Sequence, residues 1–209
     1  MRTQGFTLVE LMISVAILVV VTGLGLVALQ SSTTSIAVAK AKGDVQRSVR
    51  DIMTGLTREL QLASKRSDDS LSPPLLPLAV NTSPATGSPV EVVFQVPADG
   101  SGRNWSNPIR FRYLNEDANG NGRLDNGEDL DSDGVLARRI VRIEDRNGDG
   151  DTADAGEVTP VGAVNDLSNV QFTLNGDVLY ITVAASKLVG VRRTNPVRAR
   201  ATSSIYLLN

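Results

Sequence analysis

Oxygen-bearing side chains follow one another at fixed intervals between residues 117 and 128. Their order fits the pattern D-x-[DN]-x-[DN]-G-x5-E, which is typical of a loop that wraps around Ca2+. Calcium takes about six to eight oxygen ligands, and the glycine at the sixth position allows the sharp turn that such a loop needs. The predicted ligands of this first loop are Asp117, Asn119, Asn121, the carbonyl oxygen of Arg123, Asp125 acting through water, and Glu128.

Two partial copies of the same pattern lie nearby. The second has its glutamate one residue later than the pattern requires, and the third has Ile140 where the closing acid belongs. The predicted ligands are Asp145, Asn147, Asp149, Asp151 and Glu157 in the second loop, and Asp129, Asp131 and Asp133 in the third, weaker one. The alternative is a solvated acidic loop in each case, because Asp, Asn and Gly are also common turn residues.

Charge and composition favour cation binding over catalysis. The net charge is only -2, but 13 of the 23 acidic residues lie between residues 115 and 157, together with 5 arginines. Carboxylates at this density repel one another without cations, whereas bound calcium could stabilise a domain that has no disulfide. The chain contains neither cysteine nor histidine, so a thiol nucleophile and the commonest general base are both missing. We expect Ca2+ as the cofactor and no enzymatic activity.

The segments around the loops predict a β-rich domain. Apolar and polar residues alternate at 109–114 and 170–174, and the Asn-Gly pair at 175–176 is typical of a tight hairpin. The predicted strands are 90–96, 109–114, 135–143, 170–174, 178–184 and 199–207. Because the first loop follows a strand, we expect a calcium loop that is not flanked by two helices.

A long helix is predicted before the strands. Val38, Val45, Val49, Ile52, Leu56 and Leu60 form a stripe at helical spacing, which indicates an amphipathic helix that packs on a sheet. Proline is absent until Pro73, so one helix could run from Phe6 to about Ser64. A long helix followed by antiparallel strands gives an α+β fold.

The beginning of this helix is almost wholly apolar from Phe6 to Leu29, which is long enough to cross a hydrocarbon core of about 30 Å. Arg2 precedes this segment and no basic residue follows before Lys40, so the amino terminus is expected in the cytoplasm and the remainder outside. The alternative is a cleaved signal peptide, with a mature chain that begins at Leu26. Glu10 argues against it, because a charge in an apolar core costs about 2.5–3.5 kcal/mol and suggests a function.

The residues Gly5-Phe6-Thr7-Leu8-Val9-Glu10 and the apolar run after them resemble the junction of type IV prepilins and type II secretion pseudopilins. The resemblance implies that prepilin peptidase cleaves after Gly5 and that the new amino-terminal Phe6 is N-methylated. It also implies that Glu10 pairs with the amino terminus of a neighbouring subunit, so that two ions that are costly alone in an apolar bundle neutralise each other. Residues 1–5 would be the leader, 6–29 the transmembrane and filament-core helix, 30–66 the amphipathic helix, and 67–209 a β-rich head with calcium loops at 115–157.

In function, the resemblance implies a structural subunit of a type IV pilus that is assembled into the filament or primes it. The large, irregular head favours a minor pilin over a bulk one. Expected partners are other pilin or pseudopilin subunits, prepilin peptidase and the assembly platform of the inner membrane, without direct contact to nucleic acid. We expect the chain in the inner membrane before assembly and in a periplasmic or extracellular filament afterwards.

Two alternative functions stay open. The terminal residues TSSIYLLN resemble the last strand of the W/J class of minor pilins and pseudopilins, so a J-like pseudopilin of a type II secretion system is the first. The second comes from another class of protein: a membrane-anchored calcium-binding adhesin or envelope enzyme whose likeness to pilins is accidental.

Overall fold

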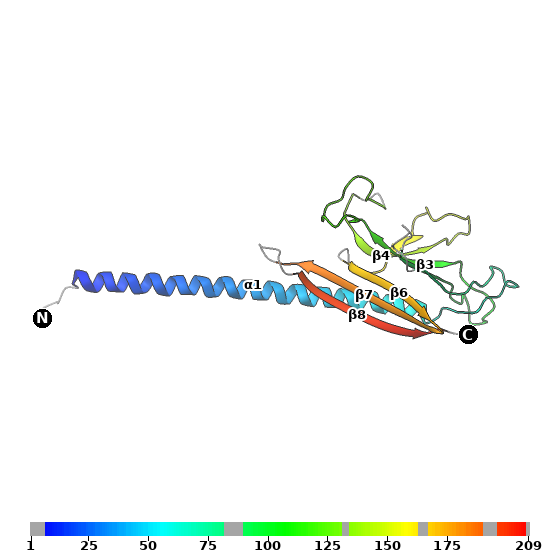
Figure 1. The fold of residues 1–209 in the computed structure, drawn as a ribbon, viewed down its shortest axis with the longest axis horizontal. Helices are drawn as coiled ribbons and strands as arrows, with labels where there is room; N and C mark the ends of the chain where they lie inside the picture. The colour runs from blue at the N-terminus through cyan, green and yellow to red at the C-terminus, as the bar shows by residue number, and fades with distance from the viewer. Residues whose placement is uncertain (1–6, 82–89, 131–133, 163–166, 190–195, 208–209) are drawn as a thin grey trace.

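The computed structural model describes residues 7–81, 90–130, 134–162, 167–189 and 196–207. One long helix, α1 (Leu8–Leu60), projects from a head that contains two antiparallel sheets (Figure 1). The strands are β1 (Ala79–Asn81), β2 (Glu91–Phe94), β3 (Ile109–Asn115), β4 (Arg138–Glu144), β5 (Val158–Pro160), β6 (Leu167–Asn175), β7 (Val178–Leu188) and β8 (Pro196–Tyr206). The predicted α+β fold is confirmed.

Helix α1 is continuous over 53 residues and passes through the glycines at 23, 25, 43 and 55 without a break. At about 1.5 Å per residue, its length is about 80 Å. It begins at Leu8 with Thr7 as the N-cap and ends at Leu60, so it is slightly shorter than the predicted span. The predicted first residue, Phe6, lies outside the described residues.

Burial divides α1 into two parts. All side chains from Thr7 to Lys40 are exposed, and the head covers the helix only from Ala41 onward. The buried residues are Ala41, Val45, Val49, Ile52, Met53, Leu56 and Leu60, which confirms the predicted amphipathic stripe with the exception of Val38, whose exposed fraction is 41 %. The helix therefore combines an apolar part outside the head with a part that forms the head's core.

The head contains a five-stranded sheet in the order β1-β2-β3-β4-β5 and a three-stranded sheet in the order β6-β7-β8. All neighbouring strands are antiparallel. The six predicted strands are present, with bounds that shift by a few residues, whereas the short strands β1 and β5 were not predicted. The hairpin at Asn-Gly is confirmed, because Asn175 pairs with Val178 and Gly176 has a φ of +60°.

The segment after β5 comes very close to α1. Gly162 has a φ of +81°, and a Cβ atom added to it would lie only 2.7 Å from Cγ1 of Ile52, which is completely buried. Glycine is therefore required at this position both for the backbone conformation and for the close approach. This contact holds the end of the five-stranded sheet against the helix.

A buried carboxylate closes the long connection between β3 and β4. The side chain of Glu116 is completely buried, and its Oε1 and Oε2 atoms accept hydrogen bonds from the backbone N–H groups of Leu130 (3.1 Å) and Ala137 (2.8 Å). These two hydrogen bonds offset the free-energy cost of burying the charged carboxylate. Glu116 thereby fixes the base of the first acidic loop.

Candidate cation-binding loops and the amino-terminal motif

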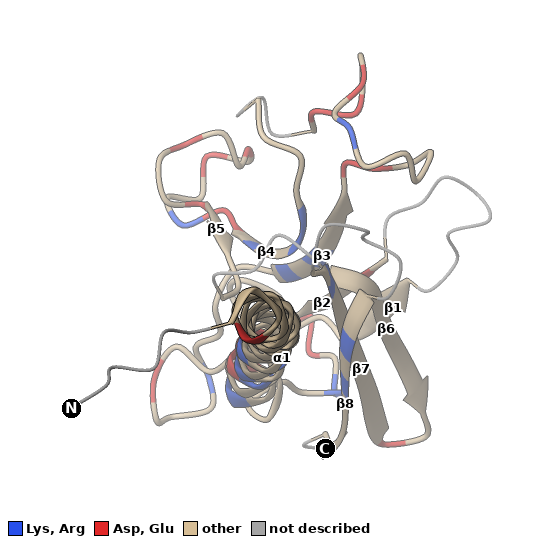
Figure 2. Ribbon diagram, turned by 90° about the vertical axis from the view of Figure 1, so that its left-hand side faces the viewer, with Lys and Arg blue, Asp and Glu red and all other residues tan. Residues whose placement is uncertain are grey.

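The predicted loops lie at the two ends of β4. The first and third occupy the connection from β3 to β4, and the second occupies the connection from β4 to β5. Because one connection precedes β4 and the other follows it, the two leave opposite ends of the strand. Figures 1 and 2 show both acidic connections projecting from the side of the head that faces away from β8.

In the first loop, Asp117 provides the anchor. Its exposed fraction is only 6 %, and its Oδ1 accepts a hydrogen bond from the backbone N–H of Gly122 at 3.1 Å. Its Oδ2 lies 3.6 Å from Nη1 of Arg138. The glycine at the sixth position has a φ of +72°, which gives the sharp turn expected from the sequence pattern.

The other predicted side chains of the first loop converge on the same place. The Nδ2 groups of Asn119 and Asn121 donate to Oδ2 of Asp125 at 2.8 and 2.6 Å. Glu128 reaches back across the loop, where its Oε1 accepts from the backbone N–H groups of Ala118 and Asn119 and its Oε2 accepts from that of Asp125. The structure thus places Asn119, Asn121, Asp125 and Glu128 in contact with one another. The ligand role of these residues, of Asp117 and of the Arg123 carbonyl stays a prediction.

The second loop has the same beginning. Oδ2 of Asp145 accepts from the backbone N–H of Gly150 at 3.0 Å, as Asp117 does from Gly122. Asn147 donates through Nδ2 to Oδ2 of Asp149 at 3.0 Å. Carboxylate oxygens of Asp149, Asp151 and Asp154 all lie within 4.8 Å of one another, so the structure adds one acid to the predicted set.

Asp154 and Glu157 are the structural equivalents of Asp125 and Glu128. Nδ2 of Asn147 donates to Oδ2 of Asp154 at 2.6 Å, as Asn119 does to Asp125. Oε2 of Glu157 accepts from the backbone N–H of Asp154 at 3.3 Å, and its Oε1 accepts from that of Arg146 at 2.9 Å. The second loop is therefore a complete copy with one inserted residue, and the spacing of three between its last two acids is unchanged. This Asp-x-x-Glu spacing is the sequence signal that would have identified Asp154.

The third loop is described only in part. Oδ2 of Asp129 accepts from the backbone N–H of Gly134 at 3.1 Å, which repeats the first contact of the other two loops. The other predicted ligands, Asp131 and Asp133, lie outside the described residues. The third site therefore stays a prediction.

Hydrogen bonds keep carboxylates of the first two loops ionised. The amide groups of Asn119 and Asn121 lower the pKa of Asp125 below its ordinary value of 3.8. The backbone N–H of Asp151 and the amide of Asn147 similarly lower the pKa of Asp149. Hydrogen bonds to the charged form favour that form, so both side chains carry the negative charge that a cation requires at neutral pH.

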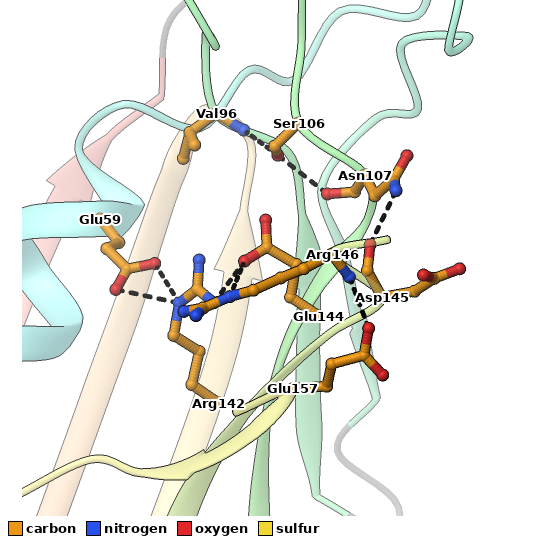
Figure 3. Close-up of polar contacts among 9 residues, drawn as sticks. All are labelled: Glu59, Val96, Ser106, Asn107, Arg142, Glu144, Asp145, Arg146 and Glu157. Carbon is orange, nitrogen blue, oxygen red and sulfur yellow. Dashed lines mark hydrogen bonds and ion pairs between the residues drawn. The ribbon is translucent and has the colours of Figure 1, made fainter. Parts of the chain in front are cut away.

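The second loop is tied to the helix by a chain of polar contacts (Figure 3). On α1, Glu59 binds Nε of Arg142 at 2.9 Å, and Nη1 of Arg142 binds Glu144 at 2.6 Å. Glu144 in turn lies 3.4 Å from Nε of Arg146, inside the loop. A further hydrogen bond joins Nδ2 of Asn107 to the carbonyl oxygen of Asp145 at 2.7 Å. The base of the second loop is thus held both by α1 and by strand β4 of the five-stranded sheet.

The amino-terminal motif appears in the structure as a helix cap. Thr7 Oγ1 accepts from the backbone N–H of Glu10 at 3.3 Å, and Oε2 of Glu10 accepts from the backbone N–H of Thr7 at 3.0 Å. This reciprocal pair is a capping box. Gly5 and Phe6, the predicted cleavage and methylation residues, lie outside the described residues.

The exposed part of α1 has the length and the apolar composition needed to cross a membrane. An 18-residue window of the helix has a mean hydropathy of 2.7, and none of that window is buried. A helix in the core of a soluble domain would be covered by other elements, whereas this segment is free of the head.

A comparison with protein families identifies the same segment. Residues 1–26 match the family model of the prokaryotic N-terminal methylation motif. Neither the curated proteins nor the solved structures gave a match. The methylation motif and the long apolar helix that continues from it support the assignment of the chain to the family of type IV pilins and pseudopilins.

Proposed function

We propose that this chain is a non-enzymatic minor pilin of a type IV pilus. It is cleaved by prepilin peptidase between Gly5 and Phe6, is held in the inner membrane by α1, and then enters a filament with its head outward. The observation that carries this proposal is the exposed part of α1 from Leu8 to Lys40, which lies entirely outside the head and is almost wholly apolar as far as Leu29. An exposed apolar surface about 33 Å long requires lipid or protein around it, which a bilayer supplies before assembly and neighbouring helices supply afterwards.

The first test is an accurate mass of the amino-terminal peptide from protein purified from its native membrane. A chain that begins at N-methylated Phe6 is the expected result. A chain that begins at Leu26 would show a conventional signal peptide and would end the filament proposal.

The capping box provides a sharp test of the charge on Glu10. Glutamine can replace glutamate in a capping box, so Glu10→Gln keeps the cap but removes the charge, whereas Glu10→Ala removes both. We expect Glu10→Gln to insert into the membrane normally but to be lost from sheared filaments, because the charge can no longer pair with a neighbouring amino terminus. Ser14→Ala, a change one turn away on the same helix, is the matched control. Normal incorporation of Glu10→Gln would refute the role of the charge.

We also propose that the first and second loops bind Ca2+ and stabilise the head. Support comes from the convergence of Asp117, Asn119, Asn121, Asp125 and Glu128, and from the equivalent set in the second loop. In the structure, the side-chain amide groups of Asn119 and Asn121 donate to Asp125 in the place that a bound cation would take. Rotation of each amide about its Cβ–Cγ bond would present oxygen instead of nitrogen, as a hard cation prefers. Outside the cytoplasm, where calcium is about millimolar, weak sites suffice.

The calcium proposal is tested by thermal unfolding of the full chain in detergent micelles, with and without calcium. At a free calcium concentration ten times the Kd of one site, binding stabilises the head by about 1.4 kcal/mol. This corresponds to a rise in Tm of about 3 to 6 °C for a chain of this size. Asp117→Ala with Glu128→Ala should remove the contribution of the first loop. Asp44→Ala with Asp69→Ala removes two exposed carboxylates outside the loops and should leave the calcium effect unchanged. The absence of any calcium effect in the parent chain would refute the proposal.

The resemblance of TSSIYLLN, most of which lies in β8, favours one second candidate within the same family: a J-like pseudopilin of a type II secretion system. The two functions place the same helix in a filament, but they differ in the machinery around it. Neighbouring genes for a retraction ATPase would support the pilus, whereas genes for a secretin with exported cargo would support the pseudopilus.

A further inference from the structure

A basic groove lies where the second half of α1 meets the edge strand β8. It has a volume of about 850 Å3 and runs along the helix from Gln46 to Gln61. It is lined by Gln46, Val49, Arg50, Met53, Thr54, Thr57, Arg58, Gln61, Arg198, Ala199, Arg200 and Ala201. Four of these residues are arginines and none is acidic, so the groove is suited to an anionic partner.

The groove arginines are available for such a partner. Arg50, Arg58, Arg198 and Arg200 are all exposed. Within the described part of the chain, none of the four forms an ion pair, in contrast to Arg142, which contacts Glu59 and Glu144. Unpaired cations around a groove raise the local concentration of anionic groups and orient them.

The groove also has apolar residues and an open strand edge. Val49 and Met53 are buried in α1, and Ala199 and Ala201 are partly buried in β8. Among the described strands, β8 pairs only with β7, so the other edge of this eleven-residue strand has no strand partner. A strand edge without a partner is a template for an additional segment of chain. A fitting partner would therefore combine acidic residues with an apolar side chain.

The first acidic loop has this composition. Leu130 is an exposed apolar residue, with an exposed fraction of 59 %, and directly follows Glu128 and Asp129. Residues 115–130 contain five acidic residues and one arginine, so the segment stays negative even with one bound Ca2+. This loop and β8 lie on opposite sides of the head (Figure 2). One molecule cannot bring the two surfaces together, but two molecules can.

We propose that the groove between α1 and β8 binds residues 125–130 of a second copy of this chain. Leu130 packs against Met53 and the alanines of β8, and the groove arginines face the net negative charge that the loop keeps with calcium bound. The two surfaces differ, so the contact is head-to-tail and places two copies of the chain in succession rather than in a symmetric pair. This inference rests on the proposed function of a filament subunit and identifies the surface through which the heads associate.

Disulfide cross-linking tests this contact directly, because the chain has no cysteine of its own. Full-length Thr54→Cys, which places a cysteine in the groove, is mixed with full-length Asn126→Cys in detergent micelles with about 1 mM calcium. We expect a cross-linked dimer from this mixture. Thr173→Cys is the matched control, since it lies exposed on β6 outside the groove, and its mixture with Asn126→Cys should give about tenfold less dimer.

Charge reversal provides the second measurement. Arg198→Glu with Arg200→Glu in the groove variant should reduce the dimer yield about tenfold, because like charges then face each other across the contact. Arg110→Glu with Lys187→Glu changes the net charge equally at exposed residues outside the groove and should have no effect. Equal dimer yields from the Thr54→Cys and Thr173→Cys mixtures, or no effect of the groove reversal, would overturn the proposal. If Thr54→Cys chains cross-link to one another in preference to Asn126→Cys chains, the groove forms a symmetric contact. That result would also overturn the proposal.

The result of the cross-linking experiment can be separated from the results that test the proposed function. If the mature chain begins at N-methylated Phe6 and Glu10→Gln fails to assemble, a negative cross-linking result refutes only the docking contact. If the chain begins at Leu26, the filament itself is refuted, whatever the cross-linking shows.

Discussion

Among the described glycines with a positive φ, Gly162 is the one whose replacement by alanine should destabilise the head most. Two costs add at this position. At a φ of +81° an L-residue pays about 1–2 kcal/mol, and the new Cβ would lie 2.7 Å from Cγ1 of the buried Ile52. Forcing extra volume into a packed core costs about 1–3 kcal/mol. We expect a total of about 3 kcal/mol, or a decrease in Tm of about 6 to 12 °C for a chain of this size.

Thermal unfolding followed by Trp105 fluorescence measures this loss. Trp105 is the only tryptophan and lies in the connection between β2 and β3, so its signal reports on the head without a contribution from the membrane part of α1. The full chain in detergent micelles is the sample for the parent and for each variant.

Two further variants separate the backbone cost from the clash. Gly176 also has a positive φ, but an added Cβ would meet nothing within 4 Å; Gly176→Ala should therefore cost only about 1 kcal/mol. In an Ile52→Ala background the clashing Cγ1 atom is gone, and Gly162→Ala should then cost no more than Gly176→Ala. A Gly162→Ala chain as stable as Gly176→Ala in the parent background would refute the argument that β5 is pinned to α1.

Three other predictions follow from the polar contacts. Arg142→Leu should lower the free energy of unfolding by about 2 kcal/mol in urea titrations, since it leaves two partly buried carboxylates facing each other. The side chain and backbone N–H of Ser101 lower the pKa of Asp99 below its ordinary value of 3.8. The stability that this contact contributes is therefore present above pH 3.8 and is lost as the pH falls through the lowered pKa. The Tm of Asp99→Asn should accordingly decrease less than that of the parent between about pH 7 and pH 3. Asp154→Asn and Glu157→Gln should each reduce the calcium-dependent rise in Tm, and an unchanged rise in Asp154→Asn would exclude Asp154 as a ligand.

The main elements could be predicted from the sequence because their patterns are long. The stripe on α1 extends over several turns, and the alternation in β3 and β6 covers enough positions to define a period of two. β1 and β5 have only three residues each, too few to show a period. Both are edge strands, and their existence depends on the neighbouring strand rather than on their own sequence.

The loops show where a fixed template fails. Asp117 to Glu128 fits the twelve-residue pattern, and the predicted side chains converge. The second loop contains one additional residue, so counting from Asp145 finds Glu157 late and misses Asp154. What the fold preserves is the local turn that joins the last two acids, in which Glu157 accepts a hydrogen bond from the backbone of Asp154. Spacing within such a turn is fixed by hydrogen bonds, whereas spacing across the loop can change.

The separation of α1 into an apolar half and a head-binding half lets the subunit change its surroundings without refolding. Because the head covers the helix only from Ala41 onward, the contacts that hold the head together are the same whether the first half lies in lipid or among other helices. In the assembly that we propose, extraction from the membrane would be a transfer between two apolar environments, with the folded head carried along as a rigid body. The two halves are also exchangeable in principle: a different head joined in register near Lys40 would keep the same anchor.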